Sequence, residues 1–488
     1  MNLATADLQF LRSRVPGIVV TPADPGWNEA RQAWNLCVDQ RPAAVVVPED
    51  AAGVASAIAF ARECGLRVAP QTTGHNAAPL GDLEGSILLR TSSLRDVGID
   101  PVRRRARVGA GALWQDVMEP AHAHGLVALG GSAPDVGVVG YSLGGGIGWL
   151  SRLYGLATNS LLAVELVTPD GRLVRADDEH ETDLFWALRG GGGNFGVVTA
   201  LEFALYPHAE VYGGMMAWDW SESERVLQRW SEWAAGALDA VTTSARIMRL
   251  PPLPDIPEPL RGRRLVMIDG AYAGDPATAE EVLAPLRELG PELDFFGVMP
   301  SPGLIRLHGD PEHPVPGLSD HAMLASLPAE AVRAFVAAGP ARARPCCRPS
   351  CASWAARSDA PRPATTRCPG WKPPSRCSPS GSPWTTRWPR RPSGTRAAWW
   401  RRWSRGSPGA PTSTSPSARP TPPPAITPRT SVVCRAFAPE SIPMASCTPT
   451  TRSRRPETAK ATAPAAGPMM NPPPVPARRH SLGRTSPC

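Results

Sequence analysis

The sequence predicts an α+β fold in two units, followed by a tail of different composition. Residues 39–207 alternate short apolar runs with helical patterns and two hairpins, and residues 208–340 combine amphipathic helices with strands in another rhythm. Residues 341–488 lack the aliphatic side chains that a core requires. Residues 1–38 are a leading segment. These three observations set the predicted domain boundaries.

The net charge of +7 comes from the tail. Residues 1–340 hold 26 basic and 41 acidic side chains, a net of −15, whereas residues 341–488 hold 25 basic and three acidic, a net of +22. The tail also contains eight of the ten cysteines, 30 of the 57 prolines and one leucine, Leu482. Such a segment cannot bury enough apolar surface to offset the entropy of folding, so we expect it to be disordered. The basic charge is therefore no argument that the folded part binds nucleic acid.

The chain shows no sign of a membrane segment or a secretory signal. No apolar run approaches the roughly 20 residues that span a bilayer, and residues 1–14 include Asp7 and no apolar core segment. We therefore expect a cytoplasmic protein that does not bind membranes.

The first unit is expected to begin with a buried strand at 43–47 and a helix at 50–65, which has an acidic start and a C-terminal glycine. The further elements expected in chain order are strands at 68–70 and 86–89, a hairpin of 97–100 with 106–108, a helix at 113–124, an extended segment at 126–129, a hairpin of 161–169 with 172–176, a helical turn or two at 183–189, and a strand at 197–205 that leaves the unit.

The loop 71–76, Gln-Thr-Thr-Gly-His-Asn, follows the predicted strand at 68–70. It leaves the carboxyl end of that strand, where α/β proteins bind ligands. Gly74 allows the backbone to approach a ligand closely, and the polar side chains and N–H groups can donate hydrogen bonds to a phosphate. His75 adds an imidazole that is a nucleophile when neutral. A single histidine is more often an ordinary packed or exposed residue, so the loop alone leaves both interpretations open.

Two glycine clusters follow. The run 191–196 satisfies the pattern G-x-G-x-x-G of nicotinamide-binding turns, but a helix is expected before it and a strand after it, which is the reverse of that motif. We therefore reject a nicotinamide site. The run 144–148 places three consecutive glycines ahead of a predicted helix and permits close approach to a flat or phosphorylated ligand. Its apolar flanks, among them Val138 and Trp149, argue against a flexible surface loop.

The second unit is expected to contain helices at 218–238 and 276–289 and strands at 264–271 and 293–299. It shows no catalytic motif. His308, His313 and His321 lie among prolines and glycines without metal-ligand spacing, so we expect loop residues and no metal site.

Several motifs occur in a consistent order: the strand and helix from residue 42, the loop 71–76, the run 133–146, the hairpin strand 164–172 and the run 183–192. Together they resemble the flavin-dependent oxidases of the berberine bridge enzyme-like group, which have the vanillyl-alcohol-oxidase or PCMH-type FAD-binding fold. The resemblance is firm over 40–205 and loose over 205–340. It implies a two-subdomain FAD-binding domain followed by an α+β substrate domain, which is incomplete in this chain.

The resemblance implies that FAD is bound through its pyrophosphate by the loop 71–76 and covalently through His75. A neutral imidazole suits attack on the flavin 8α-methyl carbon. Some members add a second tether through a cysteine, but this chain has Ala133 there, so a single tether is expected. The implied cofactor contacts are Gln71, Thr72, Thr73, Gly74, His75, Asn76, Val136, Gly140, Ser142, Gly144, Gly145, Gly148 and Val197.

The resemblance also implies an oxidase that transfers hydride from a small alcohol, sugar or secondary metabolite to flavin, which O2 reoxidises. Two alternatives come from other classes: a non-catalytic flavin-binding remnant, and a nucleic-acid-binding arm formed by the basic tail. The sequence leaves the substrate and the oligomeric state open. Tyr141 borders the expected flavin pocket, but no catalytic residue is assigned.

Codon arithmetic suggests a frameshift near residues 339–344. The chain has two lysines against 49 arginines, which is typical of a GC-rich gene, and such a gene read out of frame yields Arg, Pro, Ser, Ala and Thr. Residues 411–418 can be encoded so that the frame beginning at the third base reads Tyr-Leu-Asn-Phe-Ala-Glu-Arg, which resembles the family's C-terminal flavin motif. Residues 344–358 and 440–453 can likewise encode family-like segments. The family's catalytic residues would then lie in the unread frame.

Overall fold

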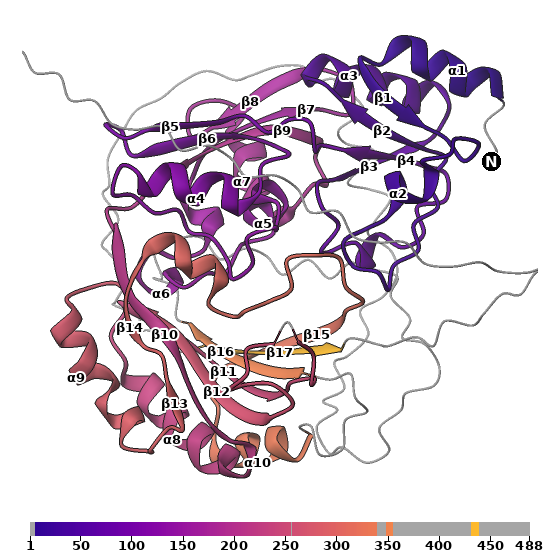
Figure 1. Cartoon of the computed structure of the whole chain (residues 1–488). Helices are drawn as coiled ribbons and strands as arrows, with labels where there is room; N and C mark the ends of the chain where they lie inside the picture. The colour runs from indigo at the N-terminus through magenta and orange to yellow at the C-terminus, as the bar shows by residue number, and fades with distance from the viewer. Residues whose placement is uncertain (1–4, 255, 339–347, 355–430, 439–488) are drawn as a thin grey trace, which may run out of the picture. The chain divides into compact units, whose positions relative to one another are not determined.

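The computed structural model describes residues 5–254, 256–338, 348–354 and 431–438 (Figure 1). Two compact units are separated at Ser441, and every described residue belongs to the first, Met1–Ser441. The described residues form three β-sheets of four, eight and five strands with helices packed on them, which confirms the α+β prediction.

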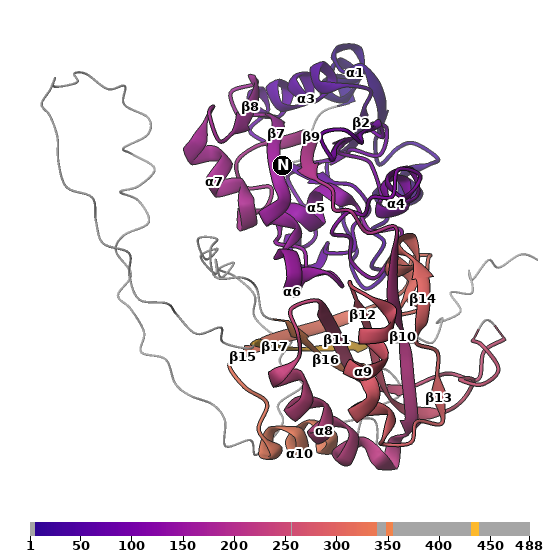
Figure 2. The same cartoon turned by 90° about the vertical axis from the view of Figure 1, so that its left-hand side faces the viewer.

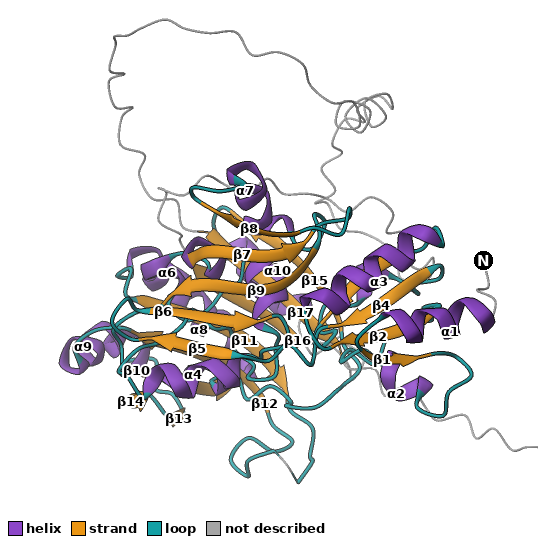
Figure 3. Ribbon diagram, turned by 90° about the horizontal axis from the view of Figure 1, so that it is seen from above, coloured by secondary structure: helices purple, strands orange, loops and turns teal. Residues whose placement is uncertain are grey.

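The four-stranded sheet has the order β1-β2-β4-β3. Its strands are β1 (Gly17–Val20), β2 (Ala44–Pro48), β4 (Ser86–Arg90) and β3 (Arg67–Gln71), of which β2, β4 and β3 are parallel. Helix α3 (Ala51–Glu63) begins after Asp50, whose carboxylate accepts a hydrogen bond from the Gly53 N–H at 2.8 Å. Helix α1 (Thr5–Arg14) packs against α3 (Figures 2 and 3). The fully buried Val46, Val54, Ile87 and Leu89 form the core between sheet and helices.

The five-stranded antiparallel sheet has the order β5-β6-β9-β7-β8. Its strands are β5 (Val97–Asp100), β6 (Arg105–Gly109), β9 (Val197–Ala204), β7 (Leu161–Val167) and β8 (Leu173–Asp177). Strand β9 is the last of this sheet in the chain and leads to β10 of the next sheet, as expected. It is also the central strand, because it pairs with β6 on one side and β7 on the other. The expected extended segment at 126–129 forms only a single bridge, between Val127 and Tyr206. Helices α4 (Trp114–His122), α5 (Val138–Leu143), α6 (Ser151–Tyr154), η2 (Ala157–Ser160) and α7 (Thr182–Gly191) lie between its strands in the chain. The short helices α2 (Trp27–Arg31) and η1 (Ala78–Leu80) lie between strands of the four-stranded sheet.

The eight-stranded sheet has the order β13-β10-β12-β11-β16-β17-β15, and β14 also pairs with β10. Its strands are β10 (Glu210–Asp219), β11 (Val241–Arg249), β12 (Arg264–Tyr272), β13 (Leu293–Asp294), β14 (Gly297–Pro300), β15 (Leu318–Leu324), β16 (Arg348–Trp354) and β17 (Ser431–Ala438). Helices α8 (Ser223–Gly236), α9 (Pro276–Arg287) and α10 (Ala329–Ala338) cover one face (Figures 1 and 2). The 3-10 helices η3 (Trp220–Glu222) and η4 (Ser301–Arg306) complete the described part.

Two expected elements of this sheet need correction. The helix expected from residue 218 begins only at Ser223, because Trp218 and Asp219 end strand β10 and pair with β12. The strand expected at 293–299 is divided into β13 and β14, which both pair with β10. Phe295 and Phe296 lie between them outside both registers, although the Phe295 N–H still donates to the Met215 carbonyl at 2.8 Å.

The expected disordered tail falls mostly outside the described residues. Within 341–488 the structure describes only β16 and β17, which pair with each other, with β11 and with β15. In the part of the chain that is described, no helix is both long and apolar enough to cross a membrane.

Candidate functional site

The loop 71–76 leaves the carboxyl end of β3, as the sequence predicts. Its carbonyls face segment 33–35: the Trp34 N–H donates to Thr73 O at 2.9 Å and the Asn35 N–H to Gly74 O at 3.4 Å. Gly74 has a φ of +89°, and a Cβ there would lie 2.9 Å from the Ala33 Cβ, so this close approach requires glycine. The backbone N–H groups of residues 73–76 donate no hydrogen bond to a backbone carbonyl of another described residue. These donors are therefore available to a ligand.

Two predicted site residues use their side chains to fasten the loop. The Gln71 and Gln40 side-chain amides exchange two hydrogen bonds, of 2.9 and 3.1 Å. Thr72 Oγ1 donates to the Ala110 carbonyl at 2.9 Å and lies 2.9 Å from Thr91 Oγ1. The backbone carbonyls are engaged as well, because Gln71 O accepts from the Thr91 N–H at 3.2 Å and Thr72 O from Arg90 at 3.3 Å. Gln71 and Thr72 therefore position the loop.

The His75 ring is held on three sides. Thr73 Oγ1 lies 2.7 Å from His75 Nδ1, and the Trp34 indole stacks on the imidazole with 3.9 Å between ring centroids and 18° between planes. Asp135 Oδ1 lies 3.4 Å from His75 Nε2. The Trp34 indole N–H donates to the other oxygen, Asp135 Oδ2, at 2.6 Å. Three residues from three separate stretches of the chain thus fix one imidazole.

The facing atoms of His75 and Asp135 are both buried, and neither makes a hydrogen bond within the described residues. Burial raises the pKa of the Asp135 carboxyl, but its contacts with His75 and Trp34 lower it more, so that the pKa lies below its ordinary value. Asp135 is therefore ionised at neutral pH and presents an acceptor to His75 Nε2.

The glycine run 144–148 follows helix α5 in the chain and lies beside the Tyr141 ring. Gly145 and Gly146 have φ values of +116° and +75°, and a Cβ on Gly146 would lie 2.5 Å from the Tyr141 ring. A Cβ on Gly148 would lie 2.1 Å from the Gly130 carbonyl oxygen. The Gly146 and Ile147 N–H groups donate no backbone hydrogen bond to a described residue. We call residues 144–148 the glycine wall. Its backbone packs closely on neighbouring atoms, and the Gly146 and Ile147 N–H groups are available as hydrogen-bond donors.

The two motifs meet at Gly137, where an added Cβ would lie 3.0 Å from the Thr72 Cβ. Of the other predicted site residues, Ser142 is buried, and Asn76, Gly140 and Gly144 are exposed. Val197 lies apart, because its side chain is buried in the apolar core of the four-stranded sheet. Only its backbone is left for a cofactor contact.

Arg90 is a site residue that the sequence gave no reason to select. Its guanidinium donates to three backbone carbonyls, those of Ala30, Gln32 and Thr72. Burial lowers the pKa of Arg90 to about 10. One buried side chain thus connects the segment that carries Trp34 to the loop that carries His75.

A second buried arginine connects the glycine wall to the eight-stranded sheet and its helices. Arg152 on α6 donates to the carbonyls of Ala234 and Ala237, which end α8, at 3.3 and 2.7 Å. Nearby, the buried Trp149 ring meets His308 edge to face, with 4.8 Å between centroids. The sequence patterns also missed Trp34 and Asp135, although Asp135 lies inside the motif 133–146.

Several buried polar atoms near these walls lack a hydrogen-bond partner within the described residues: His75 Nε2, Trp114 Nε1, Asp135 Oδ1, Trp149 Nε1, Thr158 Oγ1 and Ser301 Oγ. Buried polar groups are normally satisfied, so a group of such atoms indicates a polar ligand or water. The described residues contain no cluster of three or more His, Cys, Asp or Glu side chains suited to a metal ion.

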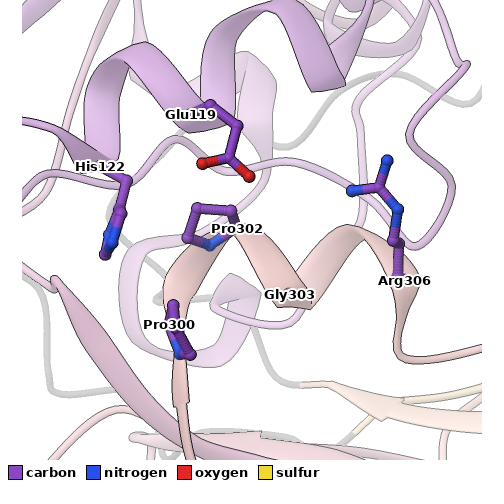
Figure 4. Close-up of a pocket in the computed structure, with 6 residues that line it drawn as sticks. All are labelled: Glu119, His122, Pro300, Pro302, Gly303 and Arg306. Carbon is purple, nitrogen blue, oxygen red and sulfur yellow. The ribbon is translucent and has the colours of Figure 1, made fainter. Parts of the chain in front are cut away.

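A cavity of about 350 Å³ lies elsewhere, between α4 and η4 (Figure 4). Glu119, His122 and Arg306 line it together with Pro300, Pro302 and Gly303. Arg306 is already paired with Glu312 at 2.9 Å. The cavity contains none of the predicted site residues, and we assign it no ligand.

Comparisons with known proteins identify the domain that contains these residues. The family model described as FAD binding domain matches residues 42–177. The chain is 35% identical over 211 residues to (R)-6-hydroxynicotine oxidase of Paenarthrobacter nicotinovorans, covering 43% of this chain and 46% of that protein. It is 31% identical over 317 residues to an uncharacterized FAD-linked oxidoreductase of Bacillus subtilis, covering 64% and 68%. The chain thus spans about half the length of the first of these relatives.

Solved structures with this fold include 6-hydroxy-D-nicotine oxidase from Arthrobacter nicotinovorans, with a TM-score of 0.65, 23% identity and coverage of 91% of this chain and 84% of that one. A berberine bridge enzyme-like protein of Physcomitrella patens gives 0.62 at 20% identity, with coverage of 71% and 77%. A carbohydrate oxidase from Microdochium nivale gives 0.61 at 21%, with 71% and 76%. At these identities the likeness establishes the fold.

Proposed function

Because this chain belongs to the FAD-linked oxidoreductases, we propose that it is an oxidase that carries FAD on a single covalent bond to His75 and oxidises a small organic substrate. FAD is its cofactor, and the α+β fold is that of PCMH-type oxidases. The covalent bond, the hydride transfer and the return of electrons to O2 are the proposed part.

The observation that carries the proposal is the confinement of the His75 ring by Thr73, Trp34 and Asp135. A surface histidine has no need of three fixed partners. A histidine that must present one nitrogen to a bound cofactor does need them, because a nucleophile has to be oriented before it reacts. No cysteine occupies the position of the second tether, where this chain has Ala133.

The residues present fit FAD. The N–H groups of residues 73–76 supply donors for a pyrophosphate. The backbone from Gly144 to Gly148, with Tyr141 beside it, supplies a wall that side chains do not obstruct, as a flat ring system requires. The partnerless buried atoms of Trp149 and Thr158 supply further polar contacts. We assign the cofactor to these residues.

The chemistry that FAD supplies when bound is the acceptance of a hydride from a substrate carbon and the onward transfer of two electrons. The protein binds, orients and shields. Gln71 and Thr72 fix the loop, Arg90 holds the loop against segment 30–32, and the buried Trp149 limits the access of water to the glycine wall. We assign no catalytic base.

We propose a neutral alcohol, sugar or amine as substrate. Among the described residues, two buried cations lie between α6 and the eight-stranded sheet: Arg152 donates to backbone carbonyls, and Arg246 is neutralised by Asp269 through hydrogen bonds of 2.6 and 2.7 Å. Neither guanidinium is therefore available to bind an anionic substrate. The names of the similar proteins, which include a hydroxynicotine oxidase and a carbohydrate oxidase, are compatible with this class.

The full-length protein is purified, precipitated with acid and washed, and the pellet is tested for flavin absorbance. Yellow colour that survives in the wild type and disappears in His75→Ala supports the covalent bond. O2 consumption is then measured on panels of alcohols, sugars and amines. Oxygen uptake on one panel supports the oxidase, whereas bound flavin without turnover identifies a non-catalytic remnant. A colourless protein that retards DNA on gels at low salt would contradict the proposal and support the basic arm.

A further inference from the structure

The contacts of His75 determine which ring nitrogen carries its proton. Asp135 Oδ1 lies 3.4 Å from Nε2, and an ionised carboxylate only accepts hydrogen bonds. A neutral imidazole beside it is stabilised when Nε2 bears the hydrogen. Nδ1 then carries the lone pair, and Thr73 Oγ1 at 2.7 Å can donate its hydroxyl hydrogen there. Both neighbours favour the same tautomer.

We propose that Asp135 is a positioning residue for flavin attachment: it holds His75 in the Nε2–H tautomer, so that Nδ1 is the nitrogen that bonds the flavin. This inference rests on the proposed covalent bond at His75. It identifies Nδ1 as the attacking atom and assigns a role to Asp135, which does not itself contact the reacting carbon.

The attachment step balances as follows. The Nδ1 lone pair forms one N–C bond to the flavin 8α carbon, and that carbon loses one hydrogen as a proton. The imidazole loses the Nε2 proton, for which Asp135 is the facing acceptor. The two electrons pass to the flavin ring, and O2 takes them up together with two protons, equal in number to the two released, as H2O2. The oxidant is therefore the O2 that the proposed reaction already uses.

Trp34 makes this inference testable with an isosteric variant. Its indole N–H donates to Asp135 Oδ2 at 2.6 Å, and an indole can only donate. In Asp135→Asn the amide oxygen must therefore face Trp34, which turns the amide N–H group toward His75. That N–H requires an acceptor at Nε2, so the proton moves to Nδ1 and the lone pair is lost from the attacking atom. Asp135→Ala removes the carboxylate without imposing either tautomer.

The rate of covalent attachment is measured in full-length wild type, D135N and D135A by mixing apoprotein with FAD and quantifying flavin fluorescence on denaturing gels. Total bound flavin before denaturation is measured in parallel. We expect D135A to slow attachment about tenfold and D135N on the order of a hundredfold or more, as when an aspartate-to-asparagine change selects the wrong histidine tautomer. Noncovalent binding should persist in both variants.

The order of the variants separates tautomer control from a structural role. If Asp135 only supported the loop, the isosteric D135N would be milder than D135A, and this order would overturn the inference. NMR of the flavin peptide 68–90, released by trypsin, should show attachment at Nδ1; attachment at Nε2 would also overturn it. If the wild type binds FAD without any covalent bond, the proposed function is contradicted, whereas the outcomes above contradict only the role of Asp135.

Discussion

Trp34 reaches the site from outside both predicted motifs, and its indole orients whatever occupies position 135. The Trp34 indole N–H donates to Asp135 Oδ2 at 2.6 Å, and the indole ring stacks on the His75 imidazole. Two roles are combined in one side chain: the ring plane supports the imidazole, and the N–H selects which atom of residue 135 turns toward it.

Trp34→Phe separates these two roles, because phenylalanine retains an aromatic face and lacks the N–H. In the Trp34→Phe background, Asp135→Asn is free to turn its oxygen toward His75 Nε2. We therefore expect the double variant to attach flavin about tenfold faster than D135N alone, a coupling that neighbouring residues commonly show. The four rates of this cycle are measured with the fluorescence assay. Additive effects of the two substitutions would contradict the assigned orientation.

Gly74 permits a second residue-scale prediction with a matched control. Gly74 and Gly81 both have left-handed φ values, +89° and +70°, so alanine costs about 1–2 kcal/mol of backbone strain at either position. A Cβ meets Ala33 only at Gly74, and at Gly81 nothing lies within 4 Å.

We expect Gly74→Ala to abolish FAD retention, because the loop must move away from segment 33–35, and Gly81→Ala to lower only the thermal unfolding midpoint. Flavin content after gel filtration and circular dichroism melts measure the two effects. Equal flavin loss in both variants would show that strain alone, and not the contact with Ala33, governs the loop.

At the scale of elements, β11 and β12 carry apolar side chains toward α8–α10 and a buried ion pair on the other face. Arg246 and Asp269 are 5% and 0% exposed. Burial lowers the pKa of Arg246, but the charge and hydrogen bonds of Asp269 raise it more. A buried pair is costly to form and more costly to break, because the remaining charge has no partner.

Asp269→Asn should therefore lower the free energy of unfolding by about 3–5 kcal/mol, measured by urea denaturation with tryptophan fluorescence. The double variant R246M/D269L should recover most of the loss, since no unpaired charge is left in the core. Asp170→Asn, which breaks an exposed pair with Arg172, serves as the control and should leave the midpoint unchanged. Equal midpoints for D269N and D170N would show that water reaches the Arg246 side chain.

The strands differ in how far the sequence alone predicts them. Strands β2, β3 and β4 and helix α3 were predictable, because local runs such as Val45-Val46-Val47 are apolar without interruption. Strand β11 was missed because Thr242, Ser244 and Arg246 are polar and yet buried, a burial that only the opposing elements explain. Strand β10 was missed because Gly213, Gly214 and two methionines have little strand propensity.

The residues of the candidate site likewise fall into those that the sequence predicts and those that it does not. His75 and the glycine runs were predictable from local motifs, whereas the Trp34–Asp135 hydrogen bond joins residues 101 positions apart. Contacts of that separation are decided by the pairing of sheets and leave no periodic signal in one sequence. Arg90 illustrates the same limit, because its three carbonyl partners become neighbours only when β3 pairs with β4 and segment 30–35 contacts the loop.

At the scale of the whole molecule, the domain that carries His75 is held to the residues after 208 by buried polar contacts. Arg152 donates to the end of α8, and the Asn35 side-chain amide exchanges hydrogen bonds of 2.8 and 3.1 Å with the backbone of Gly317. These contacts lie directly beside the glycine wall and beside Trp34. The eight-stranded sheet and its helices therefore help to support the proposed cofactor site.

We propose that the chain after residues 339–344 is read out of frame, because net charge changes there from −15 to +22 and the aliphatic residues end. The nucleotide sequence should contain, in the frame beginning at the third base of the present codons, an uninterrupted reading frame that encodes Tyr-Leu-Asn-Phe-Ala-Glu-Arg opposite residues 411–418. A gene with one nucleotide inserted before codon 341 restores that frame. Its product should consume O2 faster than the present chain, and its covalent flavin content should be at least as high, because His75 and its partners precede the insertion. Stop codons throughout the shifted frame would show that the basic tail is the native end of this reading frame.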